Sequence, residues 1–442
     1  NSNKNNIIFL FSISLYTLLI FLISSRNEKV YTYLKNNLPV TTKQIIKDSL
    51  PYQFYLSKNK KDVLSNFIKG KLVNVDPINL SIRQKNINKL RNKRADALEK
   101  RILISSDNDF VEAILSDSKD VVSANIRLKG DFTDHLQSNR WSYRVKINNG
   151  KVFMGMQKFS LQSPVTRNYI WEWVYHELLR YEGLPSIRYS FRPLILNGTN
   201  LGIYAIEEHF DKILIESNSF KEGPILKLSE DKLWQQRLNN LSDKDTYFQT
   251  YSKPFKLNYI NKNNVLMGNL NVANQLLNGF HQNKLSTSDV FDIDKLAKFF
   301  AISDLVNSFH SSVWHNMRFY YDPIQSKLIP VGFDGDPNEF PLEELSITRF
   351  NSDPINLPFF NDKQFLEKYI KALERVSKRD FLEGFFLKNK ETFNRNAAIL
   401  FKSFPALDIN KKTLYDNQET IKKFIKPYLP INSFLQSISP NS

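Results

Sequence analysis

An uncharged and mostly apolar run lies near the start of the chain. It covers Ile7–Ser25 and contains no polar side chains other than Ser, Thr and Tyr. Nineteen helical residues are about 28 Å long, close to the hydrocarbon thickness of a bilayer. A buried helix of this length in a soluble domain would show a polar face. A cleaved signal peptide would have a shorter apolar region and small residues at its end, where this chain has Ile23 and Ser25. The pattern favours a transmembrane anchor over residues 1–26, with a cleaved signal as the alternative.

The charges that flank this run do not fix its orientation. Lys4 precedes it, while Arg26, Glu28 and Lys29 follow it, so the positive residues are not confined to one side. A short N-terminal tail before a large body is commonly arranged with the body outside the cytoplasm. We therefore expect a single-pass protein of the cell membrane whose soluble body is extracytoplasmic.

Residues 27–120 combine a polar stalk with a strongly basic segment. Within Ser81–Arg101 apolar residues recur near helical spacing, which predicts an amphipathic helix. The apolar positions are Ile87, Leu90, Ala97 and Leu98, and the basic ones are Arg83, Lys85, Lys89, Arg91, Lys93, Arg94, Lys100 and Arg101. The basic face would suit an anionic surface polymer, or it is simply the solvated side of the helix.

The pattern changes to strands in residues 121–230. In Trp141–Ile147 apolar and polar residues alternate, as in a half-buried strand with a cationic polar face. Two further strand-like runs, Phe191–Leu196 and Leu201–Ile206, flank Asn197-Gly198, a dipeptide typical of hairpin turns. This part is expected to be the β-rich lobe of the protein.

One helix is expected among these strands, and the C-terminal half is expected to be mainly helical. Ile170–Tyr181 has a helical pattern that ends before a Gly-Leu-Pro stop. Residues 231–290 are polar and irregular and are interpreted as an insertion. Residues 291–404 should hold a helix over Phe291–Val306, a hairpin and two further helices. Residues 405–442 are expected to form a loosely packed tail.

This order of elements predicts an α+β protein with two lobes. Two helices are expected in residues 361–404. The first of them has one apolar face, formed by Phe365, Tyr369, Ile370, Leu373 and Val376.

The composition excludes several kinds of chemistry. The chain has no Cys, so disulfides, thiolate metal sites and cysteine nucleophiles are absent. No Walker A or GxSxG motif occurs, and His176-Glu177 lacks the second His of a zinc-protease motif. The net charge of +16 would allow a polyanionic partner, but the basic residues are spread along the chain, which fits a general compositional bias. Nucleic acid is therefore not an expected partner.

The later hairpin brings two candidate metal ligands together. Met317–Tyr321 and Leu328–Phe333 are strand-like, and folding them back on each other centres the turn near Gln325. In that register Asn316 and Asp334 are equidistant from the centre and lie side by side. An amide oxygen and a carboxylate form a hard-oxygen site suited to Mg²⁺, although polar ends that merely cap an ordinary hairpin have the same pattern.

Five motifs in order along residues 124–340 resemble the CotH kinase family, the protein-kinase-like proteins typified by a spore coat protein. They are Ile126–Asp131 (IRLKGD), Trp141–Ile147 (WSYRVKI), Leu196–Asp211 (LNGTNLGIYAIEEHFD), Gly223–Lys227 (GPILK) and Leu305–Asp336 (LVNSFHSSVWHNMRFYYDPIQSKLIPVGFDGD). No single motif is specific, but their order is. The resemblance implies a two-lobed protein-kinase-like fold that follows the anchor, and transfer of the γ-phosphate of ATP to Ser or Thr hydroxyls of a protein substrate.

The resemblance also implies roles for individual residues. ATP and Mg²⁺ (or Mn²⁺) are the expected cofactors, with Asp334 and Asn316 as the metal ligands. Phosphate contacts are implied for Lys146 on its strand and for Lys129 and Gly130 in a turn, and Glu172 or Glu177 would pair with the lysine. The same cleft is expected to contain Glu208 and Lys227.

The chain departs from the family pattern at His310. Many CotH kinases have an Asp a few residues before the Asn that corresponds to Asn316, and that Asp is the expected general base. Histidine can also accept a proton near neutral pH, so His310 is the expected catalytic residue, with His315 and Asp304 as nearby alternatives. The same change would be found in a pseudokinase or scaffold that binds nucleotide, a partner protein or an anionic surface polymer. An envelope or surface-layer protein is the expected substrate or partner.

Overall fold

A computed structural model describes residues 60–130, 133–136, 139–239, 241–242, 244–338, 340–352 and 358–426. The anchor predicted over residues 1–26 and the polar stalk that follows lie outside these residues. In the described part, no helix has the length and apolar character needed to cross a membrane.

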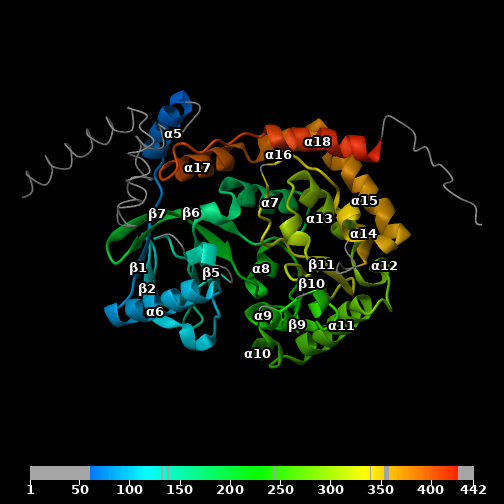
Figure 1. Cartoon of the computed structure of the whole chain (residues 1–442), viewed down its shortest axis with the longest axis horizontal. Helices are drawn as coiled ribbons and strands as arrows, with labels where there is room; N and C mark the ends of the chain where they lie inside the picture. Colours follow the sequence, from blue (N-terminus) through cyan, green and yellow to red (C-terminus); the bar gives the residue numbers. More distant parts are fainter. Residues whose placement is uncertain are drawn as a thin grey trace, which may run out of the picture. The chain divides into compact units, whose positions relative to one another are not determined.

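The protein mixes helices and sheets, as expected for an α+β chain, and divides into two compact units (Figure 1). The first unit comprises the described residues up to Trp173 together with Arg188–His209 and Asn389–Ile409. The second comprises the described residues of Val174–Ile187 and Phe210–Lys388 and those from Asn410 onward. Helix α7 (Ile170–Tyr181) has the bounds expected from the sequence and contributes to both units.

Seven strands of the first unit form a closed barrel in the order β1-β2-β3-β4-β5-β7-β6. Their bounds are β1 (Ile78–Ser81), β2 (Val111–Ser116), β3 (Val121–Leu128), β4 (Tyr143–Ile147), β5 (Lys158–Gln162), β6 (Tyr189–Leu196) and β7 (Thr199–Glu208). Neighbouring strands are antiparallel except β1 and β6, whose parallel pairing closes the barrel. The expected hairpin is β6–β7, and Asn197 and Gly198 in its turn have φ values of +48° and +82°, as a two-residue turn of this type requires.

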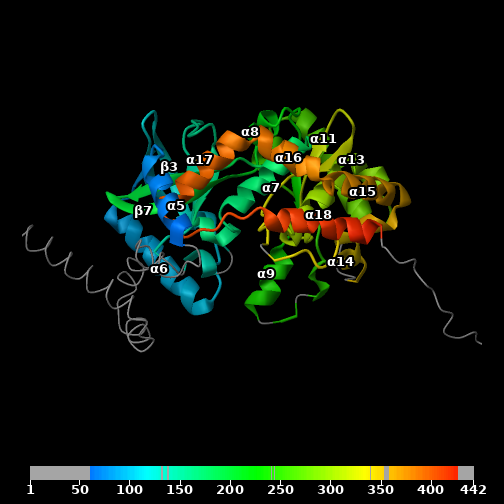
Figure 2. The same ribbon diagram turned by 90° about the horizontal axis from the view of Figure 1, so that it is seen from above.

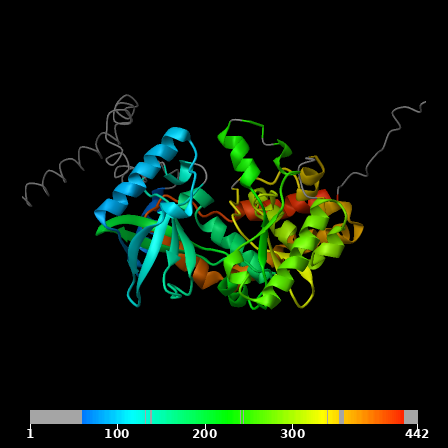
Figure 3. The same ribbon diagram turned by 90° about the horizontal axis from the view of Figure 1, so that it is seen from below.

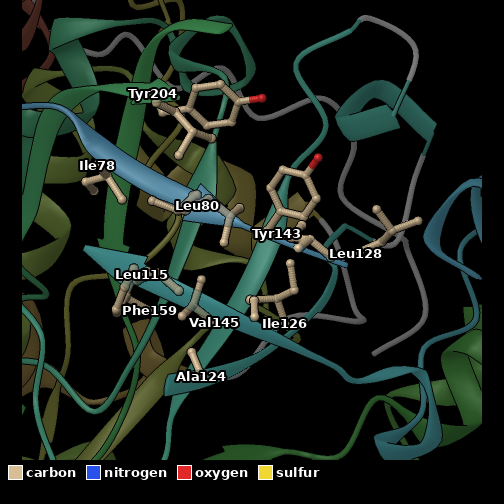
Figure 4. Packing of buried hydrophobic residues seen from close by; sticks show 14 of the residues in the cluster. Ile78, Leu80, Leu115, Ala124, Ile126, Leu128, Tyr143, Val145, Phe159 and Tyr204 are labelled. Carbon is tan, nitrogen blue, oxygen red and sulfur yellow. The ribbon is translucent and has the colours of Figure 1, made fainter. Parts of the chain in front are cut away.

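The barrel interior is filled by alternate residues of each strand. Figure 4 shows Leu80, Leu115, Ile126, Val145 and Phe159 pointing toward one another, and each is almost completely buried. The residues between them therefore face outward, which places the polar positions of β3, β4, β5 and β7 together on the outside of the sheet.

Helices cover parts of the barrel. The expected basic helix is α6 (Gln84–Lys100); it lies across the strands (Figure 3) and buries Ile87, Leu90 and Ala97. Helix α5 (Lys60–Leu72) lies beside α17 (Lys390–Phe401) (Figure 2).

The second unit contains a four-stranded sheet in the order β11-β10-β8-β9. Its strands are β8 (Ile225–Leu228), β9 (Ser252–Pro254), β10 (Arg318–Asp322) and β11 (Lys327–Pro330). Its helices are α8 (Lys212–Ser217), α9 (Asp231–Leu238), α10 (Leu257–Ile260), α11 (Asn264–His281), α12 (Thr287–Val290), α13 (Ile293–Leu305), α14 (Ser346–Ser352), α15 (Lys363–Val376), α16 (Arg379–Lys388) and α18 (Lys412–Ile425).

The interpretation of residues 231–290 as irregular was wrong. Helix α11 occupies 18 of these residues, and β9 pairs with β8 as an edge strand of the sheet. The helix buries Leu266, Leu270, Ala273, Leu277 and Phe280. Because four Asn residues lie between these positions, the apolar stripe is narrow and the segment looks like a loop in the sequence.

The C-terminal segments also contain more helix than expected. Residues 361–404 hold three helices, α15, α16 and α17, rather than two. The expected apolar face of α15 is buried, except that Ile370 is 41% exposed. Within the expected loose tail, α18 packs with Leu414 and Ile421 buried, so that expectation was wrong for residues 412–425.

Candidate functional site

The turn between β3 and β4 carries Lys129 and Gly130. The Lys129 N–H donates to the carbonyl of Ser142 (2.8 Å), and the Ser142 N–H donates to the carbonyl of His135 (3.0 Å), so hydrogen bonds close the turn. Gly130 has a φ of +114°, and a Cβ atom there would lie 2.7 Å from His135 Cβ. Both the backbone conformation and the close approach of His135 therefore require glycine.

Lys129 forms a buried ion pair with Glu207 on β7. Its Nζ lies 2.8 Å from Oε1 and 3.0 Å from Oε2 of Glu207, and it also donates to Gln162 on β5 (2.5 Å). The two charged side chains are only 11% and 1% exposed. Glu207 accepts further hydrogen bonds from Ser160 (3.1 Å) and Gln162 (3.0 Å). Protein kinases use a lysine–glutamate pair of this kind to hold the lysine that contacts ATP.

A second group of buried polar side chains adjoins this pair. The Tyr189 hydroxyl lies 3.5 Å from Gln162 Nε2, and burial raises the pKa of Tyr189 well above its usual value, as do the nearby charges of Glu172 and Glu207. Glu172, one of the two helix glutamates expected to pair with a lysine, is fully buried in this unit. The other, Glu177, forms an ion pair with Arg180.

Lys146, expected to contact phosphate, lies on the exposed side of β4. It is opposite Asn125 on β3 and Lys158 on β5. The buried lysine–glutamate pair thus involves Lys129 from the turn and not Lys146 from the strand.

Glu208, the other acidic residue of the same strand, forms a separate ion pair. Its carboxylate accepts hydrogen bonds from the guanidinium and the backbone N–H of Arg188, and its side chain is 1% exposed. Because Glu207 and Glu208 are adjacent on a strand, they point to opposite sides of it. Glu208 therefore binds Arg188 at the start of β6, while Glu207 binds Lys129.

Lys227 belongs to a charged cluster of the second unit. Its Nζ lies 2.6 Å from Glu230 Oε1, and Arg318 lies 3.4 Å from the same oxygen. Burial lowers the pKa of Lys227, and so does the neighbouring Arg318. Burial alone would raise the pKa of Glu230, but Arg318 and Lys227 outweigh it and hold that pKa below its usual value. Trp234 donates a further hydrogen bond to Glu230 (3.1 Å), so the cluster joins α9 to the sheet.

The hairpin that carries the predicted metal ligands forms, but its register differs by one residue from the expected one. Asp322 pairs with Lys327 and Phe319 with Pro330, so the centre of the turn lies between Ile324 and Gln325. In this register Asn316 and Asp334 are not direct partners, and both lie beyond the ends of the strands. The prediction that the ladder itself sets them side by side was therefore wrong.

His310 connects these two residues instead. Its Nε2 lies 3.2 Å from Asp334 Oδ2, and its backbone carbonyl accepts a hydrogen bond from the Asn316 side-chain amide (3.0 Å). The His310 side chain is 43% exposed, whereas that of Asp334 is 11% exposed. The amide nitrogen of Asn316 is engaged with His310, which leaves its amide oxygen to meet another group.

The backbone around Asp334 is held in an uncommon conformation. Asp334 and Asp336 have φ values of +51° and +44°, a region that few residues other than glycine adopt. Between them, Gly335 packs against the ring of Tyr175, where an added Cβ would lie 2.5 Å from the ring, and its carbonyl accepts a hydrogen bond from Ser308. Such conformations persist where the surroundings enforce them, which is frequent at functional sites.

The two alternative proton acceptors have other environments. Asp304, on α13, is fully buried and accepts hydrogen bonds from Tyr369 and from the N–H and hydroxyl of Ser346 (2.8 and 2.6 Å). Burial raises its pKa to about 6. Burial lowers the pKa of His315 to about 4, with a smaller contribution from nearby Arg237. Of the three candidates, His310 is the one whose ring contacts Asp334.

The chemistry of the donors at this site fits a nucleotide-bound Mg²⁺ ion. No cluster of three or more His, Asp or Glu side chains suited to a metal occurs in the described residues. Mg²⁺ does not need one, because it is usually held by one or two carboxylates together with substrate phosphates and water. The Asp334 carboxylate and the Asn316 amide oxygen are ligands of this hard-oxygen type.

Glu207 is the residue that sequence reasoning missed. Glu207 and Glu208 are adjacent in the motif Leu196–Asp211, and the resemblance implies a position in the cleft only for Glu208. The alternation of residues along β7 could have identified Glu207. Tyr204 and Ile206 face the barrel core, so Glu207 must lie on the outer face together with the polar positions of β5.

Comparison with protein families gives one finding for this chain. The family model described as "CotH kinase protein" matches residues 126–337, just under half of the chain. All the predicted site residues and Glu207 fall inside the matched segment. No curated protein matches the chain.

Proposed function

Residues 126–337 belong to the CotH kinase family, and from this premise we propose that the chain is an ATP-dependent protein kinase that phosphorylates hydroxyl groups of an envelope or surface-layer protein. A kinase family implies ATP and a divalent metal ion in general. The observation that carries the proposal for this chain is the set of contacts joining His310 to Asp334 and to Asn316.

Two of the parts that a kinase requires have candidates in this chain, and each is described within its own unit. In the second unit, Asp334 and Asn316 would hold the metal, which neutralises charge on the phosphates. In the first unit, Glu207 fixes the Lys129 ammonium in a buried position. A lysine held in this way can neutralise phosphate charge without reorganising.

His310 would act as the general base. If Nε2 carries the proton that is shared with Asp334, Nδ1 has a lone pair that can accept the proton of the acceptor hydroxyl. The hydroxyl oxygen then bonds to the γ-phosphorus while the bond from that phosphorus to the bridging oxygen of ADP breaks. Asp334 would orient the ring, as a carboxylate orients the histidine of a serine hydrolase.

The test is transfer of labelled phosphate from ATP, either to the protein itself or to a Ser-rich acceptor. His310→Ala should slow transfer by about 10²–10⁴-fold and leave ATP binding intact. Asp334→Asn should weaken Mg²⁺-ATP binding, measured as a smaller rise of the melting temperature with ligand. His281→Ala removes a histidine of the same unit that contacts Tyr247 (2.8 Å) and is the matched control. Unchanged transfer in His310→Ala would refute the role of His310.

A nucleotide-binding pseudokinase or scaffold is the second candidate. It is supported by the histidine at position 310, where the family pattern has the catalytic Asp. ATP with Mg²⁺ would then raise the melting temperature of the intact protein, while no labelled phosphate would be transferred to any acceptor from the same envelope.

The proposal includes a place for the protein in the cell. The apolar run over Ile7–Ser25 supports a single-pass protein of the cell membrane with an extracytoplasmic body. Its substrate would then be a protein of the same surface.

A further inference from the structure

Arg318, the first residue of β10, has a buried guanidinium that is bonded to the backbone around Asn316. Its side chain is only 7% exposed. Its Nη1 donates to the carbonyl of His315 (2.7 Å) and to the carbonyl of Met317 (3.0 Å). These two residues directly precede and follow Asn316 in the chain. The guanidinium therefore holds the backbone on both sides of one candidate metal ligand.

The same guanidinium contacts the segment that carries the other candidate ligand. It lies over the ring of Phe333, 5.0 Å from the ring centroid, and Phe333 directly precedes Asp334. The rings of Phe210 and Phe255 each lie 5.8 Å from the guanidinium. Arginine stacks favourably on aromatic faces. One buried cation thus joins the segment before β10 to the segment after β11.

Glu230, at the start of α9, holds the guanidinium from a third direction in the sequence. Its Oε1 lies 3.4 Å from Arg318 Nη2 and 2.6 Å from Lys227 Nζ, and its Oε2 accepts a hydrogen bond from Trp234 (3.1 Å). The carboxylate is 12% exposed. A buried carboxylate with three donors has little freedom to move. Lys227 is thereby connected to Arg318 through Glu230.

We propose that Arg318 is a positioning residue for the two candidate metal ligands, Asn316 and Asp334. Glu230 holds Arg318 in place, and Lys227 acts through Glu230. The inference rests on the metal-binding part of the proposed function. The hairpin ladder does not set the two ligands side by side, because both lie beyond the ends of its strands. Mg²⁺ requires near-ideal octahedral geometry at about 2.0–2.1 Å, so a contact that fixes both segments affects how tightly the ion is held.

The proposed role depends on the shape of the guanidinium as well as on its charge. Arginine presents five N–H donors in a rigid plane, so one side chain can meet carbonyls, a carboxylate and aromatic rings together. Lysine has a compact ammonium on a flexible stem and cannot reproduce this set of contacts. Arg318→Lys therefore keeps the charge beside Glu230 but releases the backbone around Asn316.

The experiment measures how the rise in melting temperature with ATP depends on Mg²⁺ concentration, so it does not require phosphate transfer. Arg318→Lys and Glu230→Gln should each raise the Mg²⁺ concentration for the half-maximal effect by about 10–100-fold, the usual cost of removing a group that orients a metal ligand. The control is Arg375→Lys. Arg375, on α15, also pairs with a buried glutamate, Glu182 (2.7 Å), and lies over the Phe381 ring (5.9 Å). It should leave the Mg²⁺ requirement unchanged.

The melting temperature without ligand separates positioning from a purely structural role. If the cluster only joins α9 to the sheet, Arg318→Lys and Glu230→Gln will melt at a lower temperature but will keep the Mg²⁺ requirement of the unmodified protein. That result overturns the inference. Glu230→Gln, in which the amide can still accept hydrogen bonds, decides the question if Arg318→Lys does not fold.

The outcomes also separate this inference from the proposed kinase activity. If no preparation transfers phosphate but the Mg²⁺ requirement rises only in Arg318→Lys and Glu230→Gln, the kinase proposal fails and the positioning role stands. An equal rise in Arg375→Lys overturns the inference. So does the absence of any Mg²⁺-dependent effect of ATP on the unmodified protein, because the two candidate ligands would then hold no metal for Arg318 to serve.

Discussion

At the scale of single residues, the buried charges of the first unit depend on each other. Glu207 is 1% exposed and receives hydrogen bonds from Lys129, Ser160 and Gln162. A buried carboxylate of this kind is stable while its partners remain, and removing one partner leaves an uncompensated charge in a low-dielectric environment. Lys129 therefore stabilises the barrel irrespective of any role in binding phosphate.

Replacing Lys129 with Met should destabilise the protein by about 3 kcal/mol, because it leaves Glu207 buried without its cation. The double variant Lys129→Met/Glu207→Gln should recover much of this loss, since a neutral amide can still bond Ser160 and Gln162. Lys146→Met on the exposed side of β4 is the control and should change the free energy of unfolding by less than about 0.5 kcal/mol. Urea unfolding measures these three variants together with the single variant Glu207→Gln, which completes the cycle. Strictly additive effects of the two substitutions would contradict the coupling between Lys129 and Glu207.

Asp304 should make the stability of the protein depend on pH. Burial raises its pKa from 3.8 to about 6 in the folded state, so the folded protein binds a proton more tightly than the unfolded chain. Its contribution to stability is therefore largest below about pH 4 and is lost as the pH rises through about 6. Relative to Asp304→Asn, the wild-type protein should gain up to about 3 kcal/mol of stability between pH 7.5 and pH 4.

Urea unfolding of both proteins at several pH values measures this difference. Tyr369→Phe provides the control within the cluster. It removes a hydrogen bond that lowers the pKa of Asp304, so the pH window should move upward. Parallel stability curves for the wild-type protein and Asp304→Asn would show that Asp304 does not titrate in this range.

At the scale of elements, glycine is required in the β3–β4 turn for two separate reasons. Gly130 has a φ of +114°, and its missing side chain leaves room for His135. Gly150, in the turn between β4 and β5, has a φ of +69° with no atom within 4 Å of an added Cβ. The two positions therefore separate the cost of backbone conformation from the cost of a steric clash.

Gly130→Ala should destabilise the protein by about 2–3 kcal/mol, and Gly150→Ala by about 1 kcal/mol. The first substitution must also displace His135 and disturb its contact with Ser142 (3.0 Å). Thermal unfolding of the two variants gives the comparison. Equal losses would mean that the turn yields to the added methyl group and that only backbone conformation matters.

The two hairpins differ in how much of their pairing could be predicted from the sequence. The β6–β7 hairpin was predicted because Asn197-Gly198 specifies its turn chemically. The β10–β11 hairpin was predicted but one residue out of register: its strand ends Tyr321 and Leu328 do pair, and this pairing is centred between Ile324 and Gln325, not on Gln325. The contact of His310 with Asp334 depends on the three-dimensional paths of the segment before β10 and the segment after β11. The spacing of the two residues along the sequence does not determine these paths.

At the scale of the whole molecule, the α+β class and the family were predictable, whereas the closure of the barrel was not. The class follows from the order of the patterns and the family from five motifs in sequence. Closure depends on the parallel pairing of β1 with β6, which places Ile78 opposite Leu194. Strands so far apart in sequence leave no local signal of their pairing, so the strands before residue 121 could not be assigned to the β-rich part.

The intact chain is expected to be attached to the cell membrane by its N-terminal apolar run. The run over Ile7–Ser25 carries no charge, so we expect the intact chain in the membrane fraction and a chain lacking residues 1–26 in the soluble fraction. The net charge of +16 offers a second route, because basic surfaces bind anionic lipid headgroups. The two routes respond differently to salt. At 1 M ionic strength the attraction between basic residues and lipid headgroups is screened within about 3 Å, whereas the burial of an apolar helix in the bilayer does not depend on that attraction.

To separate the two routes, cells expressing each form are fractionated and their membranes are washed at low and at high salt. An anchored protein remains with the membrane after the high-salt wash, and the shortened chain is released even at low salt. Release of the intact chain by salt alone would contradict the anchor and favour attachment through the basic surface.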